Sequence, residues 1–305
     1  MTLKLLWHPY KYYPYEFELA QREIDALLSP RATEKTKVGV LLTEPTRTEY
    51  AKRLVYFAAT GDDHAPTIQA RLERVNGNGP NRQSTRYSAH GLHEYKGKFN
   101  PQIPKAILNM HAIQRGSRVL DPFCGSGTSL VEAVHLGMRA SGTDVNPLAV
   151  FLANAKLSSL QITPETLRDS VLQLPAQLQE VKGGSETRRA YHESWFPPEI
   201  LSEIEGLRTA LEGLESGISR ILLACASDLL RDYSLQDPLD LRIRRRKSPL
   251  PEKPFRQAFV ETVERYAFRL KSAIDALGEI GSGSAYLTDS RSLTKNTEIG
   301  GPSTV

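Results

Sequence analysis

Cysteine is scarce in this sequence, and long hydrophobic runs are missing from it. Of the 305 residues only Cys124 and Cys225 are cysteines, too few for a disulfide framework or a structural zinc site. Every apolar segment is shorter than a membrane span, and the amino-terminal residues lack the apolar centre of a signal peptide. The sequence therefore argues against secreted disulfide-rich domains and membrane proteins. We expect a cytoplasmic protein with no membrane partner.

The charge balance is only mildly positive, with a formal net charge of +4. Such a balance permits a nucleic-acid partner without requiring one. Hydrophobic residues make up 40% of the sequence, enough to bury one large core or two smaller ones.

The periodicity of apolar residues changes along the chain and predicts four regions. Residues 15–28 have helical spacing, and residues 37–44 and 53–60 have the composition of strands. Residues 76–86 are rich in Asn, Gly and Pro, which indicates a boundary. The predicted regions are an accessory region at 1–75, a core at 76–162, a helical insertion at 163–280 and a return to the core sheet at 281–305.

The core region has the element order of an α/β protein. A strand at 116–123 is followed by a glycine-rich turn, a helix at 129–137 and a second strand at 139–146. This order is typical of one βαβ unit in a doubly wound parallel sheet. Residues 284–290 again have strand character, and we expect them to rejoin that sheet.

The glycine-rich turn is unlike two common nucleotide-binding turns. A phosphate-binding loop would end in Gly-Lys-Ser/Thr, and no lysine stands here. A dinucleotide fingerprint would place glycine where Leu130 stands. Asp121 at the strand end would repel a pyrophosphate but would suit an ammonium group, while Asp144 ends the next strand, where an acid binds ribose hydroxyls. A ligand with both an amino-acid moiety and a ribose is S-adenosylmethionine.

At these residues the chain resembles the DNA methyltransferases that modify exocyclic amino groups. DPFCGSGT at 121–128 is similar to their S-adenosylmethionine motif, residues 144–147 to their acidic second motif, and residues 93–107 to their amino-terminal motif. The resemblance covers residues 90–155. It implies a partial Rossmann-like class I methyltransferase sheet, S-adenosylmethionine as cofactor and duplex DNA as partner, without a metal. The turn alone also occurs in RNA methyltransferases.

The resemblance also assigns roles to individual residues. An acid after the third strand binds the adenine amino group in related enzymes, and here Asp289 stands at that point. Asp289 could equally be a turn residue or a helix cap. The implied cofactor-binding residues are Lys98, Phe99, Asp121, Phe123, Gly125, Gly127, Thr128, Asp144, Asn146 and Asp289.

Several other features have a structural interpretation beside a functional one. We interpret His90 and His93 as surface residues rather than metal ligands, and Cys124 as a small buried residue rather than a nucleophile. The densest positive run is either a solvated linker or a set of DNA phosphate contacts. It consists of Arg242, Arg244, Arg245, Arg246 and Lys247.

The catalytic tetrapeptide of the family, Ser/Asp/Asn-Pro-Pro-aromatic, has no match in the sequence. The only Pro-Pro pair, at 197–198, follows Phe196 and precedes Glu199, and we interpret it as a helix start. Residues 303–305 resemble the opening of the strand that carries the tetrapeptide.

We therefore expect no catalytic residue in this chain. The expectation is a split or truncated methyltransferase of a restriction-modification or related system, inactive without a second polypeptide that carries the tetrapeptide. An RNA methyltransferase and a non-catalytic cofactor-binding or DNA-binding subunit are the alternatives.

Overall fold

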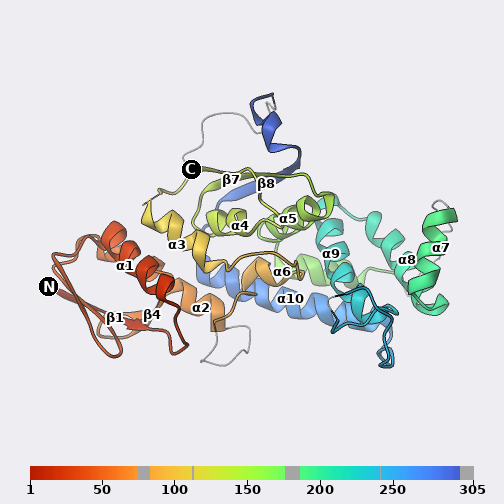
Figure 1. Ribbon diagram of the computed structural model, residues 1–305, viewed down its shortest axis with the longest axis horizontal. Coiled ribbons are helices and arrows are strands. Elements are labelled where there is room, and N and C mark those ends of the chain that lie inside the picture. Colours follow the sequence, from red (N-terminus) through yellow and green to blue (C-terminus); the bar gives the residue numbers. More distant parts are fainter. Residues whose placement is uncertain (75–82, 112, 176–185, 241, 296–305) are drawn as a thin grey trace. The chain divides into compact units, whose positions relative to one another are not determined.

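The computed structural model describes residues 1–74, 83–111, 113–175, 186–240 and 242–295 (Figure 1). Residues 303–305, where the opening of a further strand was predicted, lie outside these ranges. The chain divides into two compact units. One unit comprises Met1–Gly91, Tyr95–Gln161 and Arg269–Val305, and the other comprises Leu92–Glu94 and Ile162–Phe268.

The first unit begins with an antiparallel sheet of order β2-β3-β1-β4-β5. Its strands are β1 (Thr2–Trp7), β2 (Ala32–Lys35), β3 (Gly39–Thr43), β4 (Phe57–Thr60) and β5 (Ala65–Pro66). The helix α1 (Pro14–Leu28) packs Ile24, Leu27 and Leu28 into one apolar cluster with strand residues such as Leu5 and Leu42. The predicted helix at 15–28 and strand at 37–44 are confirmed, and the strand predicted at 53–60 begins only at Phe57, because the 3-10 helix η1 (Thr48–Arg53) precedes it.

Sequence-local features fix the ends of α1. Pro14 occupies the first turn, where its missing N–H would have no helical partner. The carboxylate of Glu16 accepts a hydrogen bond of 2.7 Å from the backbone N–H of Tyr13. At the other end, Ser29 takes a left-handed conformation that ends the helix.

The second sheet of this unit is parallel and has the order β6-β7-β8. Its strands are β6 (Arg118–Asp121), β7 (Arg139–Asp144) and β8 (Ser282–Leu287). The helix α4 (Thr128–His135) connects β6 to β7, and α5 (Pro147–Ser159) follows β7. Both helices pack against this sheet and lie side by side (Figure 1). The predicted order of strand, turn, helix and strand is confirmed, and the molecule is a mixed α/β protein.

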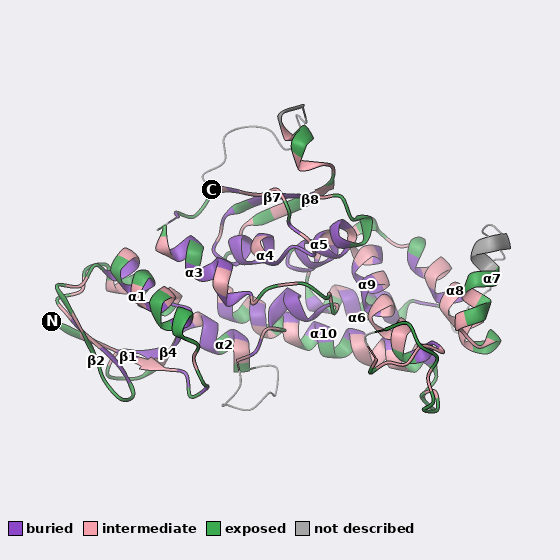
Figure 2. Ribbon diagram, in the orientation of Figure 1, coloured by how far each residue is buried: buried purple, intermediate pink, exposed green. Residues whose placement is uncertain are grey.

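The helix α4 is buried on almost every side (Figure 2). Leu130, Val131, Ala133 and Val134 are each 0% exposed. Three short helical elements lie between β5 and β6 in the described chain. They are α2 (Ile68–Arg74), the 3-10 helix η2 (Ser88–Gly91) and α3 (Gln102–Met110).

The second unit is mostly helical within its described residues. Its helices are α6 (Pro164–Leu172), α7 (Glu186–Trp195), α8 (Pro198–Glu212), α9 (Ser216–Tyr233) and the first part of α10 (Phe255–Leu277). Pro198 opens α8 directly after Pro197, so the helix start predicted at the Pro-Pro pair is confirmed. None of the described helices combines the length and apolar character needed to cross a bilayer.

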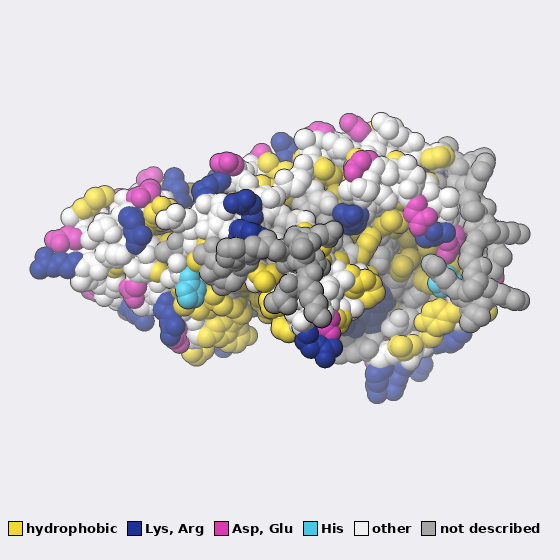
Figure 3. All heavy atoms as spheres, turned by 90° about the horizontal axis from the view of Figure 1, so that it is seen from above, with side chains coloured by type: hydrophobic (Ala, Val, Ile, Leu, Met, Phe, Trp, Pro, Cys, Tyr) yellow, Lys and Arg dark blue, Asp and Glu magenta, His cyan; other side chains and the backbone are white. Residues whose placement is uncertain are grey.

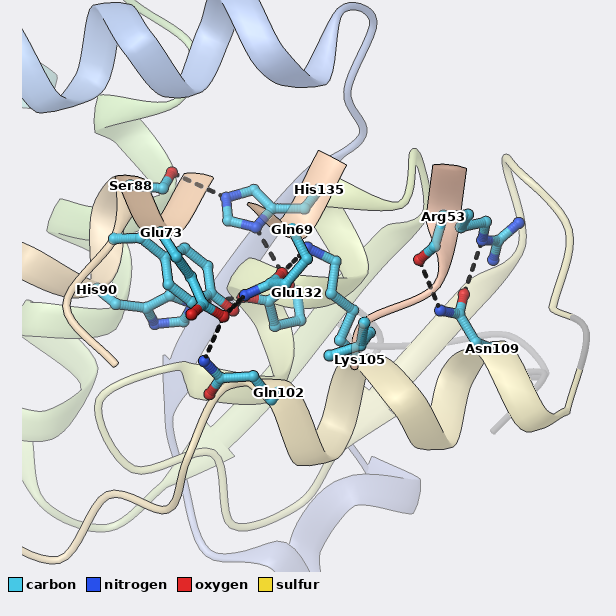
Figure 4. Close-up of polar contacts among 12 residues, drawn as sticks. Arg53, Gln69, Glu73, Ser88, His90, Gln102, Lys105, Asn109, Glu132 and His135 are labelled. Carbon is cyan, nitrogen blue, oxygen red and sulfur yellow. Dashed lines mark hydrogen bonds and ion pairs between the residues drawn. The ribbon is translucent and has the colours of Figure 1, made fainter. Parts of the chain in front are cut away.

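A buried carboxylate on α4 joins several elements of the first unit. Glu132 is 0% exposed, and its Oε1 accepts hydrogen bonds from the Tyr87 hydroxyl at 2.8 Å and lies 2.7 Å from His90 Nε2 (Figure 4). Its Oε2 lies 3.2 Å from both Lys105 Nζ and His135 Nδ1. We call these five residues the Glu132 network. Because a buried charge is costly unless it is paired, this network fixes α3 and the segment around η2 against α4.

The charge states in the Glu132 network follow from burial and proximity. Burial alone would raise the pKa of the Glu132 carboxyl, but Lys105 and His135 hold it well below its usual range. Burial lowers the pKa of His90 to about 3 and lowers that of His135 as well. The network is therefore one Lys–Glu ion pair with neutral histidines around it.

Removing the cation of this pair is expected to destabilise the fold. In a Lys105→Met variant the Glu132 carboxylate stays buried without its countercharge, and we expect a loss of about 3–5 kcal/mol in the free energy of unfolding. Adding Glu132→Gln to that variant recovers part of the loss, because the uncompensated charge is gone. Urea titrations followed by circular dichroism measure both values. The control is Lys271→Met, which removes a lysine that is 56% exposed and is expected to change little. Equal stability of Lys105→Met and the wild type would contradict the network's role.

The neutral histidines also predict a pH dependence. Unfolded histidines bind a proton below about pH 6.5, whereas His90 stays neutral in the folded chain until about pH 3. The unfolded state therefore binds more protons in this window, and stability falls as the pH drops, by up to about 1.4 kcal/mol per pH unit for one such histidine. His90→Gln keeps a donor for Glu132 and removes the titrating group. Urea titrations between pH 6.5 and 4 should show a shallower decline in this variant than in the wild type, and equal declines would contradict the assignment.

Candidate functional site

Three carboxylates lie where the three parallel strands end. Asp121 is the last residue of β6 and pairs with Gly142, while Asp144 is the last residue of β7 and pairs with Leu287. Asp289 follows the end of β8 by two residues. The strands are parallel, so their ends lie at one edge of the sheet, which we call the carboxyl edge. Ligands of open α/β sheets bind at such edges.

The turn between β6 and α4 is fixed to the neighbouring strand. The N–H of Cys124 donates to the carbonyl of Thr143 at 2.9 Å, and the Thr143 hydroxyl donates to the carbonyl of Pro122 at 2.9 Å. Gly125 and Gly127 have positive φ angles of 50° and 81°, a conformation that favours glycine. Gly127 is also the residue from which α4 starts. We call residues 122–127 the glycine turn.

The two glycines of this turn have different surroundings. A Cβ on Gly127 would lie 2.9 Å from the Cβ of Ala153, so this glycine allows α4 and α5 to approach each other. A Cβ on Gly125 would meet only the ring of Tyr95, at 3.9 Å. Of these two glycines, which the resemblance implies as cofactor-binding residues, Gly125 leaves room for a ligand beside the backbone, whereas Gly127 packs against α5.

A buried lysine that was not predicted as a site residue donates hydrogen bonds to the glycine turn. Lys156 on α5 is 0% exposed, and its Nζ donates to the carbonyl and the hydroxyl of Ser126 at 2.9 and 3.0 Å. The surrounding residues Ala153, Ala155 and Leu157 are apolar and buried. A lysine inside such an apolar helix is the one signal in the sequence that could have indicated it.

Asp144 connects the end of β7 to the glycine turn. Its Oδ2 accepts a hydrogen bond of 3.0 Å from the N–H of Gly125, and its Oδ1 accepts one of 2.8 Å from the N–H of Asn146. The Asn146 side chain caps α5 through the N–H of Leu148 at 3.0 Å. Each carboxylate oxygen can accept a second hydrogen bond, so Asp144 can hold the turn and also bind hydroxyl groups of a ligand.

Large apolar side chains are exposed around these acids. Phe123, two residues after Asp121, is 76% exposed, and Val145 and Leu148, just after Asp144, are 69% and 48% exposed. Figure 3 shows hydrophobic side chains in several exposed groups on one face of the chain, with Lys and Arg side chains among them. Carboxylates next to exposed apolar side chains suit a ligand with both a polar and an apolar part.

Cys124 of the glycine turn and Thr128, the first residue of α4, are buried. Thr128 is 3% exposed and Cys124 is 6% exposed. Burial, with Asp121 and Asp144 nearby, raises the pKa of the Cys124 thiol to about 12. The thiol therefore stays protonated near neutral pH, and the prediction of a small buried residue is confirmed.

The segment before α3 approaches the turn through Tyr95 rather than through the predicted Lys98. The Nζ of Lys98 donates to the carbonyls of Thr85 and His90, at 3.5 and 3.4 Å. The ring of Tyr95 lies next to Gly125, and its hydroxyl is 3.5 Å from Asn146 Nδ2. Lys98 thus closes a loop of backbone, and that loop carries Tyr95 and the exposed Phe99.

Asp289 has the geometry of a turn residue and also lies at the carboxyl edge. Its carboxylate accepts a hydrogen bond of 2.9 Å from the N–H of Arg291 and forms an ion pair with the same residue. Arg291 lowers the pKa of Asp289 to about 2. This geometry fits both predictions for Asp289, a cofactor-binding acid and a turn residue.

One group of described residues has side chains suited to a metal ion, namely His90, Glu132 and His135, whose ligand atoms lie within 4.8 Å of one another. All three are buried, and the prediction that His90 is a surface residue is wrong. Both carboxylate oxygens of Glu132 already have partners within the Glu132 network. The ammonium of Lys105 supplies the positive charge that a metal would bring. The chemistry of this cluster is that of a buried ion pair.

The basic run lies in the second unit and divides into two groups. Arg245 donates to the carbonyl of Ser194 at 2.9 Å and covers the ring of Trp195 at 5.4 Å. Arg246 donates to the carbonyls of Asp232 and Ser234, at 2.6 and 3.0 Å. These two arginines bind backbone carbonyls, Arg246 from a partly buried position and Arg245 from an exposed one, and Arg242, Arg244 and Lys247 are exposed as well.

Comparison with known proteins agrees with this geometry. Residues 92–185 match the family model for an RMKL-like methyltransferase domain. The chain is 41% identical over 73 residues to the type II methyltransferase M.MjaII of Methanocaldococcus jannaschii, covering 24% of this chain and 14% of that protein. It is 25% identical over 169 residues to the type II methyltransferase M.MvaI of Kocuria varians, covering 50% of this chain and 36% of the relative.

A third relative is named as an enzyme that acts on RNA. The tRNA (guanine(10)-N2)-dimethyltransferase of Methanothermobacter thermautotrophicus is 38% identical over 52 residues, which are 17% of this chain and 16% of that protein. The chain thus spans well under half the length of each of these relatives. Within the matched region, these findings confirm the predicted resemblance to the DNA amino-methyltransferase family.

Proposed function

We propose that the carboxyl edge binds S-adenosylmethionine and that the protein contributes this site to the methylation of an exocyclic amino group of DNA, with the catalytic tetrapeptide supplied by a second polypeptide. The single observation that carries the proposal is the pairing of Asp144 with Gly125. A carboxylate with free acceptor capacity stands at one strand end, and it is fixed against an open glycine turn at the next. This arrangement presents acceptors for ribose hydroxyls beside space for an amino-acid moiety.

The residues of the edge fit the parts of the cofactor. Asp144 would bind the ribose, and Asp121 would face the ammonium group. The backbone at Gly125 and the amino-terminal end of α4 would receive the methionine carboxylate, because helix amino-terminal ends favour anions. Phe123, Val145 and Leu148 would cover the adenine, and Asp289 would accept from its amino group. Thr128 and Gly127 would shape the turn, and Lys98 would support the segment that carries Phe99.

The strand order supports a class I methyltransferase fold. Three parallel strands with α4 and α5 between them correspond to one half of a Rossmann-like sheet. In this proposal residues 76–162 and 281–305 form the cofactor-binding core, residues 1–75 are an accessory region and residues 163–280 are a helical insertion.

When bound, S-adenosylmethionine supplies an electrophilic methyl group for direct transfer to nitrogen. The contribution of this chain would be to hold the cofactor and to orient it at the carboxyl edge. We assign no catalytic residue within the described chain.

The second candidate is methylation of an RNA amino group. It is favoured by the similarity to the tRNA (guanine(10)-N2)-dimethyltransferase. We rank DNA first because the similarity to the type II methyltransferase M.MvaI extends over 50% of this chain and because the segment at 93–107 resembles the DNA family.

Cofactor affinity is expected to depend on Asp144 and Gly125. Asp144→Ala removes the acceptors for the ribose hydroxyls and should weaken S-adenosylmethionine binding by about 1.5–3 kcal/mol. Gly125→Ala adds a methyl group on the ligand side and should weaken binding in a chain that still folds. Calorimetric titration measures both affinities.

Gly127→Ala is the matched control, since it has a similar backbone strain but directs its methyl group at Ala153. It should lower the free energy of unfolding, and adding Ala153→Gly should restore much of that loss. Wild-type affinity in both Asp144→Ala and Gly125→Ala would refute the cofactor site.

The choice between DNA and RNA is tested by competition. In the presence of S-adenosylhomocysteine, a fluorescent duplex DNA bound to the chain should be displaced by unlabelled duplex DNA at a lower concentration than by tRNA. Anisotropy at several salt concentrations measures this, because non-specific phosphate contacts weaken as salt increases. Preferential displacement by tRNA would favour the second candidate.

A further inference from the structure

The basic run belongs to a loop between α9 and α10. After α9, residues 235–237 pair with residues 244–246 as two short antiparallel segments. Gln236 bridges Arg245, and the N–H of Asp237 donates to the carbonyl of Arg244 at 2.8 Å. We call residues 237–240 and 242–247 the basic loop, and Leu241 lies outside the described residues.

Side chains fix the base of this loop to the second unit. Arg246 and Arg245 donate to backbone carbonyls of residues 194, 232 and 234. Arg231 on α9 donates to the carbonyls of Asp237 and Asp240. The loop therefore has an anchored base, which Arg231, Arg245 and Arg246 hold through backbone carbonyls.

Two carboxylates shape the tip of the loop. Asp237 Oδ1 accepts hydrogen bonds from the N–H groups of Leu239 and Asp240, at 2.9 and 3.3 Å. Asp240 Oδ1 accepts one of 3.0 Å from the N–H of Arg242. Both aspartates are thus used locally to order the backbone, which is a common role of this residue in turns.

This ordered tip exposes apolar side chains between cations. Leu239 is 92% exposed and Ile243 is 74% exposed. The side chains of Arg242 and Arg244 are 70% and 57% exposed and share Asp240, at 3.3 and 3.5 Å. A single exposed leucine is ordinary on a protein surface. Two exposed aliphatic side chains among cations on one anchored loop suit a partner with charged groups beside stacked apolar rings.

We propose that the basic loop binds duplex DNA, with Leu239 and Ile243 inserted at a base step and with Arg242, Arg244 and Lys247 on the flanking phosphates. Aliphatic wedges of this kind unstack base steps in proteins that deform DNA. An enzyme that acts on a base amino group needs the base outside the stack, and a wedge lowers the cost of extruding it. This inference rests on the proposed action on DNA.

Charge favours DNA over a protein partner for this loop. The loop carries five cationic side chains against two carboxylates. The centres of protein–protein interfaces are depleted in such charges, whereas phosphates lie on both sides of every base step.

The test uses the full chain and a duplex of pyrimidine–purine steps that contains 2-aminopurine, whose fluorescence rises when it is unstacked. Such steps are the most easily deformed. The wild type should raise the fluorescence. Leu239→Ala/Ile243→Ala should abolish the rise and weaken binding about 10-fold, with an unchanged salt slope, since a buried aliphatic side chain contributes about that much. Arg242→Ala/Arg244→Ala should lower the magnitude of the salt slope by about 2.

Two matched controls accompany these variants. Leu172→Ala removes a leucine that is 81% exposed on α6, and Lys37→Ala removes an exposed cation of the first unit. Both should bind and unstack the duplex like the wild type. S-adenosylmethionine affinity, measured by calorimetry, should be the same in all variants.

The outcomes separate this inference from the proposed function. Wild-type fluorescence and affinity in Leu239→Ala/Ile243→Ala would overturn the wedge. Absence of duplex binding by the wild type would also overturn it. So would self-association through the loop, or binding of an acidic protein to it, detected by light scattering. Cofactor binding in the same preparations reports on the proposed function independently.

Discussion

A single buried carboxylate, that of Glu132, constrains much of the first unit. Because the charge cannot reach water, it requires donors, and these come from Tyr87, His90 and Lys105 on other segments as well as from His135 on its own helix. The helix that carries Glu132 begins at the glycine turn. The network therefore fixes the helix against which the turn is built, and it positions the segment that leads to Tyr95.

The carboxyl edge combines local rigidity with remaining binding capacity. Lys156 holds Ser126 from below, and Asp144 holds Gly125 from the side. Neither contact blocks the ligand side of Gly125, where a side-chain carbon would meet only Tyr95. Preorganised groups of this kind bind a cofactor without a further ordering cost.

The local parts of this architecture could be predicted from the sequence, and the long-range parts could not. The strands at β6 and β7 and the turn between them follow from apolar runs and glycine spacing. The distinct roles of Gly125 and Gly127 depend on Ala153, which is distant in sequence. His90 was misplaced on the surface because an isolated histidine carries no sign of a buried carboxylate partner. The division of the basic run depends on carbonyls of residues 194, 232 and 234, which no charge pattern indicates.

The most direct test of the central claim is hydrogen exchange of the backbone amides with and without S-adenosylmethionine. If the carboxyl edge binds the cofactor, exchange slows in peptides that cover residues 121–130 and 144–150, where the turn, the start of α4 and the start of α5 would contact it. The peptide that covers the basic loop should exchange at the same rate in both samples. Unchanged exchange at 121–130 and 144–150 under saturating cofactor, or protection confined to other segments, would contradict a cofactor site at the carboxyl edge.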